Sequence, residues 1–217
     1  MAKQRSFYQC TQCGYECAKW MGKCPNCGSW NTLEEQLPAQ AAPAHRSAMG
    51  ASGSKAAPGK SVQLREIAGT HAPRKKTGIG ELDRVLGGGI VAGSVVLAGG
   101  EPGIGKSTLF LQMADRLAQG ADVLYISGEE SGEQVAMRAE RLELNSPVKF
   151  LAETNLSVIL ATIEQEKPDF LIIDSIQTIY HEEVASAAGS VSQVRECAAA
   201  LARMAKSTGT ALFIIGH

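Results

Sequence analysis

Residues 94–108 read SVVLAGGEPGIGKST. A short apolar run is followed by a turn, residues 100–107, that has the spacing of a P-loop, G-x-x-x-x-G-K-S. An amphipathic stretch then begins at Lys106. A strand, such a turn and a helix in this order place backbone N–H groups around phosphate oxygens at the helix N-terminus. The stretch therefore predicts an α/β domain that binds a nucleotide.

The side chains of this turn have separate expected roles. Lys106 is expected to neutralise β and γ oxygens of ATP, and the Ser107 hydroxyl is expected to coordinate Mg²⁺. The cofactor-binding residues predicted here are Gly100, Glu101, Pro102, Gly103, Ile104, Gly105, Lys106, Ser107 and Thr108. The alternative is a glycine-rich turn that binds nothing, but a lysine in such a turn has no packing purpose.

Acidic residues follow two of the apolar runs. The run at 170–174 ends in Asp174, from which a carboxylate reaches the Mg²⁺ shell beside a P-loop. Glu129 and Glu130 follow the run at 123–127, at the edge of a parallel sheet where ligands bind. We favour Glu129 as the catalytic base and Glu130 as its supporter. The alternative for Asp174 is a structural cap at the end of a strand. The alternative for Glu129 and Glu130 is that they only place negative charge near a helix N-terminus, where it is favourable.

The remaining pattern alternates short apolar runs with amphipathic segments, as in a mostly parallel sheet covered by helices. Strands are expected to begin near Ser94, Val123, Val148, Phe170 and Ala211. Four helices are expected, with apolar stripes at 110–117, 135–142, 156–163 and 194–205. Ser190 and Gln193 have the spacing of a capping box at the start of the fourth helix.

The N-terminal region contains two Cys-x-x-Cys pairs, Cys10 with Cys13 and Cys24 with Cys27. Four thiolates at this spacing can surround Zn²⁺ tetrahedrally, and about 30 residues cannot fold on burial alone. The alternative is a disulfide framework, which the reducing compartment expected for a P-loop protein disfavours. Cys17 is either a substitute ligand or, as we favour, a spare thiol. The sixth cysteine, at 197, is expected to be a packed core thiol.

Trp20 and Trp30 flank the second pair, and we expect them to pack on it; the alternative is that they stack on bases or contact a partner.

Residues 36–60 are mostly Ala, Pro, Gly and Ser, which predicts a flexible linker. The expected domains are thus 1–35 (zinc finger) and 61–217 (core). Because the last predicted strand ends near residue 217, we expect a core that is truncated, in a fragment of a longer protein.

Charge is distributed unevenly. Residues 1–78 carry 11 Lys and Arg against 4 Asp and Glu, and residues 79–217 carry 10 against 18. A basic N-terminal region can contact nucleic acid, although an excess of Lys and Arg is also typical of an ordinary solvated surface. There is no apolar run of about 20 residues and no signal-peptide pattern, so we expect a cytoplasmic protein with no membrane association.

Four segments together resemble one family. They are CTQCGYECAKWMGKCPNCGSWNT (10–32), TGIGELDRVLGGGIVAGSVVLAGGEPGIGKSTL (77–109), DFLIIDSIQT (169–178) and GSVSQVRE (189–196). The sequence is similar to the bacterial RadA (Sms) family of RecA-like DNA-repair ATPases. The resemblance implies a RecA-like P-loop ATPase core preceded by a small four-cysteine zinc finger, hexameric rings, and ATP-driven movement on single-stranded DNA together with RecA.

The resemblance also assigns residues. It implies zinc ligands at Cys10, Cys13, Cys24 and Cys27, ATP binding by 100–107, catalysis by Lys106 and Glu129, and a Mg²⁺-associated acid at Asp174. His217 resembles the polar residue that senses the γ-phosphate. The loop 180–189 lies where ring-shaped relatives direct a segment toward DNA, and Arg195 either meets phosphate or is an ordinary surface arginine.

Two parts of the family pattern, a Lys-Asn-Arg-Phe-Gly motif and a domain similar to one in Lon protease, are absent from these 217 residues. We therefore expect this chain to bind nucleotide but to form no productive ring. The leading hypothesis is an ATP-dependent DNA motor, a DNA-stimulated ATPase or helicase, acting on branched recombination intermediates. The alternatives are a nucleotide-gated assembly protein that docks on RecA through its zinc module, and a phosphotransferase.

Overall fold

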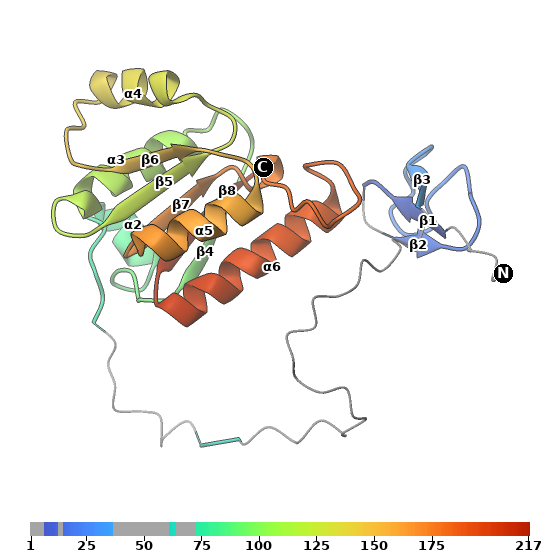
Figure 1. The fold of residues 1–217 in the computed structure, drawn as a ribbon, viewed down its shortest axis with the longest axis horizontal. Helices are drawn as coiled ribbons and strands as arrows, with labels where there is room; N and C mark the ends of the chain where they lie inside the picture. The colour runs from blue at the N-terminus through green and yellow to red at the C-terminus, as the bar shows by residue number, and fades with distance from the viewer. Residues whose placement is uncertain (1–6, 13–14, 37–60, 64–72) are drawn as a thin grey trace.

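A computed structural model describes residues 7–12, 15–36, 61–63 and 73–217 of the chain (Figure 1). The N-terminal elements are β1 (Phe7–Cys10), β2 (Glu16–Cys17) and β3 (Leu33–Gln36). The larger unit contains α2 (Gly80–Val85), β4 (Val95–Gly99), α3 (Lys106–Ala118), β5 (Val123–Ser127), α4 (Gly132–Arg141), β6 (Lys149–Ala152), α5 (Leu156–Glu166), β7 (Phe170–Asp174), a 3₁₀ turn (Ile176–Thr178), α6 (Val191–Thr208) and β8 (Ala211–Gly216).

The larger unit is built on a five-stranded sheet of order β4-β8-β7-β5-β6. All four strand pairs are parallel. The five predicted strands and the four predicted helices are therefore confirmed, and so is the α/β fold class. The short helix α2 was not predicted, because its six residues lie between glycines and are too few to show a periodic pattern.

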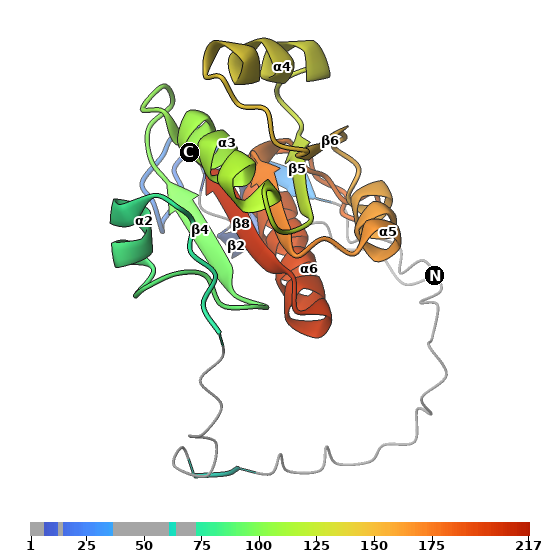
Figure 2. The ribbon, with the colours of Figure 1, turned by 90° about the vertical axis from the view of Figure 1, so that its left-hand side faces the viewer.

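The central strands β5, β7 and β8 are buried at every position. Their alternate side chains enter two separate cores. One core includes Tyr125, Ile172 and Phe213 with the buried side of α3. The other includes Ile126, Ile173 and Leu212 with α5 and α6. Helices therefore cover both faces of the sheet, which explains the nearly continuous apolar runs in these strands (Figure 2).

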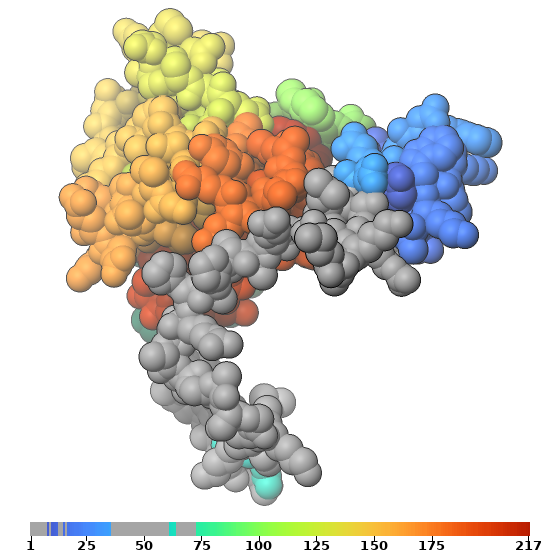
Figure 3. All heavy atoms as spheres, turned by 45° about the vertical axis from the view of Figure 1, so that its right-hand side comes forward, coloured from blue at the N-terminus to red at the C-terminus, as the bar shows by residue number. Residues whose placement is uncertain are grey.

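Helix α4 differs from the other three long helices. Ser131 and Gln134 form a capping box at its start, and of its ten residues only Val135 is buried. It projects from the body of the larger unit (Figure 3). Its connection to β5 carries the two acidic residues, Glu129 and Glu130, so its position bears on the candidate site.

The predicted capping box at α6 is half wrong. The Ser190 side chain accepts a hydrogen bond from Gln193 N, as expected of a cap. The Gln193 side chain does not return to the cap. It is buried, accepts from His181 N at 2.8 Å and donates to Val184 O at 3.0 Å and Ser186 O at 2.9 Å. Gln193 thus organises the loop between the 3₁₀ turn and α6, where unpaired backbone groups would otherwise be costly.

The N-terminal unit is an antiparallel sheet of order β2-β1-β3. Among the described residues of this unit, the buried apolar ones are Cys10, Cys24 and Leu33. So small an interior gives little stabilisation by burial. The predicted linker, 36–60, lies outside the described residues except for Gln36, which ends β3. In the part of the chain that the structure describes, no helix is long and apolar enough to cross a bilayer.

Candidate nucleotide site and metal centre

The predicted P-loop connects β4 to α3, as the sequence indicated. Gly103 and Gly105 have φ values of 82° and 96°, in the left-handed region where a side chain is strained. Gly105 is the N-cap of α3, and among the described residues no side chain caps this helix. The first N–H groups of α3 are therefore available to an anion.

Lys106 lies over the loop that precedes it. Its Nζ donates hydrogen bonds to Gly100 O at 2.6 Å and to Glu101 O at 2.8 Å. These contacts hold the ammonium group beside the helix N-terminus, where positive charge and backbone N–H groups act on the same ligand.

A cavity of about 400 Å³ opens at this point, at the carboxyl edge of the sheet. Its lining contains most of the predicted site residues: Pro102, Gly103, Gly105, Lys106, Ser107, Thr108, Glu129, Asp174 and His217. Gly100, Glu101 and Ile104 are not among the lining residues. Glu130 and Arg138 complete the wall. Arg138 is not predictable as a site residue from the sequence, because it lies inside a helical stretch and reaches the cavity only through the position of α4.

Asp174 is held by a partner from the neighbouring strand. The buried Tyr125 hydroxyl donates a hydrogen bond of 2.5 Å to Asp174 Oδ2. Burial and the nearby Asp174 charge both raise the pKa of Tyr125 above its ordinary value, so the phenol stays a donor at neutral pH. The sequence gives no signal for this contact, because it depends on β5 and β7 being neighbours.

Glu129 has two hydrogen-bond partners at the cavity. One of its carboxylate oxygens accepts from the Ser175 hydroxyl and contacts His217 Nε2 at 3.1 Å. The Ser175 hydrogen bond, together with His217 and Lys106, lowers the pKa of Glu129 below its ordinary value against the opposing effect of partial burial. Glu129 is therefore a carboxylate throughout the neutral range.

Glu130 has different partners from Glu129. Its side chain forms an ion pair with Arg138 of α4, and its backbone N–H donates to Ser127 Oγ at 3.1 Å. The pair is largely shielded on the arginine side, where 12% of the side chain is exposed. The two adjacent acids are thus separated: Glu129 faces the end of β8, and Glu130 is tied to α4.

Gly128 allows the loops at this edge to meet. A Cβ atom at this position would lie 2.2 Å from Thr178 Oγ1 and 2.9 Å from Thr154 Cγ2. Only glycine leaves room for so close an approach. The two acids therefore follow a residue whose lack of a side chain lets the 3₁₀ turn pack against β5.

The N-terminal unit brings three predicted zinc ligands together. The sulfur atoms of Cys10, Cys24 and Cys27 lie within 4.8 Å of one another, and those of Cys10 and Cys27 are 3.7 Å apart. Zn–S bonds of about 2.3 Å in a tetrahedron place sulfur atoms roughly 3.8 Å apart. The 3.7 Å separation of the Cys10 and Cys27 sulfur atoms fits a tetrahedral thiolate site and is too long for a disulfide bond between these two residues. Cys13, the fourth predicted ligand, lies outside the described residues.

The other two cysteines have separate surroundings. The Cys17 thiol donates to Lys19 O at 3.2 Å and is not part of the three-sulfur cluster. Cys197 is buried in the α5–α6 core, and burial raises the pKa of its thiol to about 11. The expectation that Cys197 is a packed core thiol is confirmed.

The two tryptophans, which were predicted to pack on the second knuckle, lie beside Gly22 and Lys23 of that hairpin but keep more than half of their surface exposed. Trp20 is 56% exposed and Trp30 is 70% exposed. Among the described residues of this unit, the buried apolar cluster consists of Cys10, Cys24 and Leu33, with Tyr8 and Cys17 packed against it, and includes neither tryptophan.

The fold and the site together define a nucleotide-binding α/β domain with a small metal-binding unit. The chain belongs to the AAA domain family, whose match covers residues 66–217. Residues 8–35 match the rubredoxin metal binding domain. Membership of the AAA domain family implies nucleotide binding, and the cysteine match suggests zinc.

Curated relatives add a closer likeness. The chain is 52% identical to the DNA repair protein RadA of Listeria monocytogenes over 218 residues, and 50% identical to that of Bacillus subtilis over 219 residues. The Pseudomonas aeruginosa protein of the same name is 51% identical over 218 residues. Each alignment covers 100% of this chain and 47% of the relative, so the chain spans about half the length of these relatives. The predicted resemblance to bacterial RadA is confirmed.

We expect Cys24→Ser to lose the metal. The wild-type chain should carry one equivalent of zinc, because the metal supplies the folding free energy that so small an interior lacks. Without the metal the N-terminal unit should also lose its fold. Metal analysis measures the zinc content and circular dichroism measures the folding, and Cys17→Ser is the matched control that should keep its zinc. A Cys24→Ser chain that retains a full equivalent would contradict the assignment.

We expect Ser175→Ala to raise the pKa of Glu129, because the largest lowering influence is removed. A lowered pKa in the folded state stabilises the fold above the unfolded-state pKa, and this contribution is lost as the pH falls through the folded-state pKa. In the variant, Glu129 should therefore become protonated at a higher pH. Carboxyl ¹³C NMR titration measures the change. The hydroxyl of Ser127 accepts a hydrogen bond from Glu130 N instead, so the control Ser127→Ala should leave the pKa of Glu129 unchanged. The same pKa of Glu129 in both variants would refute the assignment.

Proposed function

We propose that the full-length protein is an ATP-dependent DNA motor that acts on single-stranded DNA in branched recombination intermediates during repair, with RecA as its partner. The observation that carries this proposal is the convergence of Lys106, Glu129 and Asp174 on one cavity at the carboxyl edge of a parallel sheet. The likeness to DNA repair proteins supplies the setting in which that chemistry acts.

Binding rests on the loop before α3. The N–H groups at the start of α3 and the Lys106 ammonium bind the phosphates of ATP. The Ser107 hydroxyl and the Asp174 carboxylate line the same cavity and are the hard oxygen donors that Mg²⁺ prefers. When bound, Mg²⁺ would supply charge neutralisation at the phosphates. Tyr125 keeps the Asp174 carboxylate in place.

Hydrolysis requires a base that is ionised and held. Glu129 takes a proton from a water molecule, whose oxygen forms a bond to the γ-phosphorus. The bond between the γ-phosphorus and the β–γ bridging oxygen breaks, and ADP leaves with those electrons. The hydrogen bonds to Ser175 and His217 fix the direction of the Glu129 carboxylate, and Lys106 stabilises the charge on the departing oxygens.

Coupling to DNA uses residues that extend from this site. Gln177 Nε2 donates to His217 O at 3.1 Å, and His217 contacts Glu129. Gln177 lies in the 3₁₀ turn just before the loop 180–189, which Gln193 organises. A chain of contacts thus joins the base to Gln177, which lies shortly before the segment proposed to face DNA. Arg195 is well exposed at the start of α6, beside this loop.

The remaining parts of the proposal concern organisation. We propose a metal-binding unit at 1–35, a linker at 36–60 and a core from 61 onward, with zinc held by Cys10, Cys13, Cys24 and Cys27. In the full-length protein the cores assemble as a homo-hexamer in the cytoplasm.

We expect Lys106→Ala in the full-length protein to reduce DNA-stimulated ATP hydrolysis by about 100-fold or more, because charge on the transferred phosphate loses its stabilising cation. Branch movement should fail with it. Phosphate release measured with and without single-stranded DNA tests this, with the exposed Lys206→Ala as the matched control. Branch movement that persists in Lys106→Ala would refute a motor, and hydrolysis that DNA does not stimulate would favour an assembly protein.

A further inference from the structure

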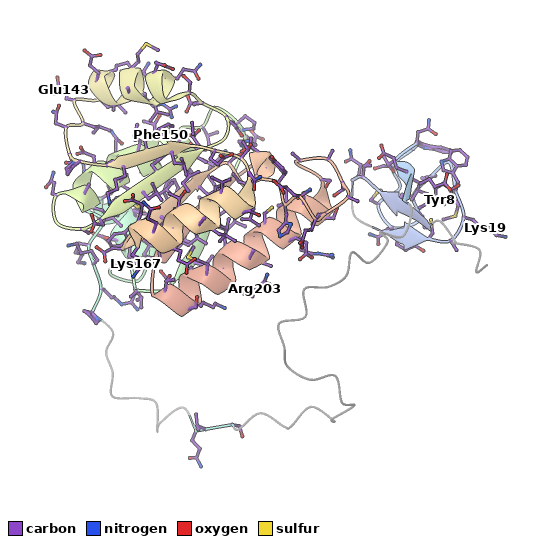
Figure 4. All side chains as sticks on the ribbon, in the orientation of Figure 1. Tyr8, Lys19, Glu143, Phe150, Lys167 and Arg203 are labelled. Atoms are coloured by element: carbon purple, nitrogen blue, oxygen red, sulfur yellow. The ribbon has the colours of Figure 1, made fainter. Side chains whose placement is uncertain are left out.

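The N-terminal unit carries an aromatic surface that the nucleotide site does not explain. The chain contains two tryptophans, and both are largely exposed on this unit, in and beside the second cysteine knuckle. We call Trp20, Trp30, Lys19 and Lys23 the indole surface. Both lysines are exposed as well. Lys19 extends outward from the unit (Figure 4).

The two rings lie close to one residue. A Cβ atom placed on Gly22 would lie 3.7 Å from Trp20 Cη2 and 3.9 Å from Trp30 Cζ3. The hydrogen bond from Asn31 N to Gly22 O, 2.9 Å long, and the bridge between Lys23 and Trp30 hold this short hairpin together. The rings are therefore presented side by side on backbone that the adjacent Cys24 anchors in the metal-binding core.

Exposure of these rings is costly unless something covers them. Each indole presents a large apolar area to water, and burial of apolar area stabilises by roughly 25 cal/mol per Å². In the described part of the unit, the buried cluster is formed by Cys10, Cys24 and Leu33, with Tyr8 and Cys17 packed against it, and the two rings are not members of it. The rings are therefore not needed for packing, which points to a ligand with flat apolar faces.

The side chains around the rings indicate which ligand. Lys23 Nζ lies 5.6 Å from the centroid of the Trp30 ring. Lysine is depleted in protein–protein interfaces, whereas it is a regular partner of phosphate groups. Surfaces that bind single strands combine aromatic rings, on which bases stack, with cations along the backbone.

We propose that the indole surface binds single-stranded DNA, with bases stacked on Trp20 and Trp30 and phosphates beside Lys19 and Lys23. The inference deepens the proposed function and rests on it for the choice of DNA over RNA. It adds a second DNA contact, separate from the loop before α6.

The rings themselves report binding, because the chain has no other tryptophan. Titration of the 217-residue chain with an oligo(dT) of about 15 nucleotides should quench the indole fluorescence. Trp20→Ala and Trp30→Ala should each weaken binding between about 5-fold and 150-fold, while the Phe variants should keep part of it. Lys19→Ala and Lys23→Ala should reduce the dependence of affinity on salt.

Asn26→Ala is the matched control, because Asn26 is exposed on the same knuckle. Zinc content establishes that each variant retains its fold, and the wild-type titration remains decisive if an alanine variant does not. DNA binding without quenching, or quenching by RecA but not by oligo(dT), would overturn the inference. Either result leaves the proposed motor intact, since that is judged by DNA-stimulated hydrolysis in the full-length protein.

Discussion

The candidate nucleotide site depends on one interaction, the attraction between an anion and the positively charged N-terminus of α3. Backbone N–H groups that no described side chain caps meet the Lys106 ammonium there, and left-handed glycines at 103 and 105 make this possible. A helix N-terminus concentrates partial positive charge, and a fixed lysine adds a full one. The other functional groups are useful only because they lie around this point. Glu129 and Asp174 line the same cavity, so they can act in the proposed chemistry once a phosphate chain is bound at this point.

The sheet brings those acids to the site. Parallel strands end at a common edge, and the register pairs Ser127 at the end of β5 with Asp174 at the end of β7. Residues far apart in sequence therefore become neighbours, and the same proximity gives Asp174 its partner Tyr125. Gly128 permits the final close approach. The cost of burying polar groups at this edge is offset by hydrogen bonds among them.

The sequence could predict features that are local. The P-loop spacing, the cysteine pairs and the apolar runs each lie within a few residues, and the fold class follows from their order. It could not predict contacts that depend on strand neighbours, such as Tyr125 with Asp174, or on the position of a helix, such as Arg138 with Glu130. Gln193 shows a further limit, because its spacing fits a cap while its side chain has better partners in a buried loop. The tryptophans show another, since the type of residue does not reveal how little interior the small unit has.

The central claim is that the start of α3 binds a nucleoside triphosphate, and isothermal titration calorimetry of the 217-residue chain tests it most directly. A slowly hydrolysed ATP analogue should bind at one site per chain, and its affinity should increase when Mg²⁺ is present. ADP should compete with the analogue for this site. A chain with its fold intact that gives no saturable heat in the presence of Mg²⁺ would contradict the account.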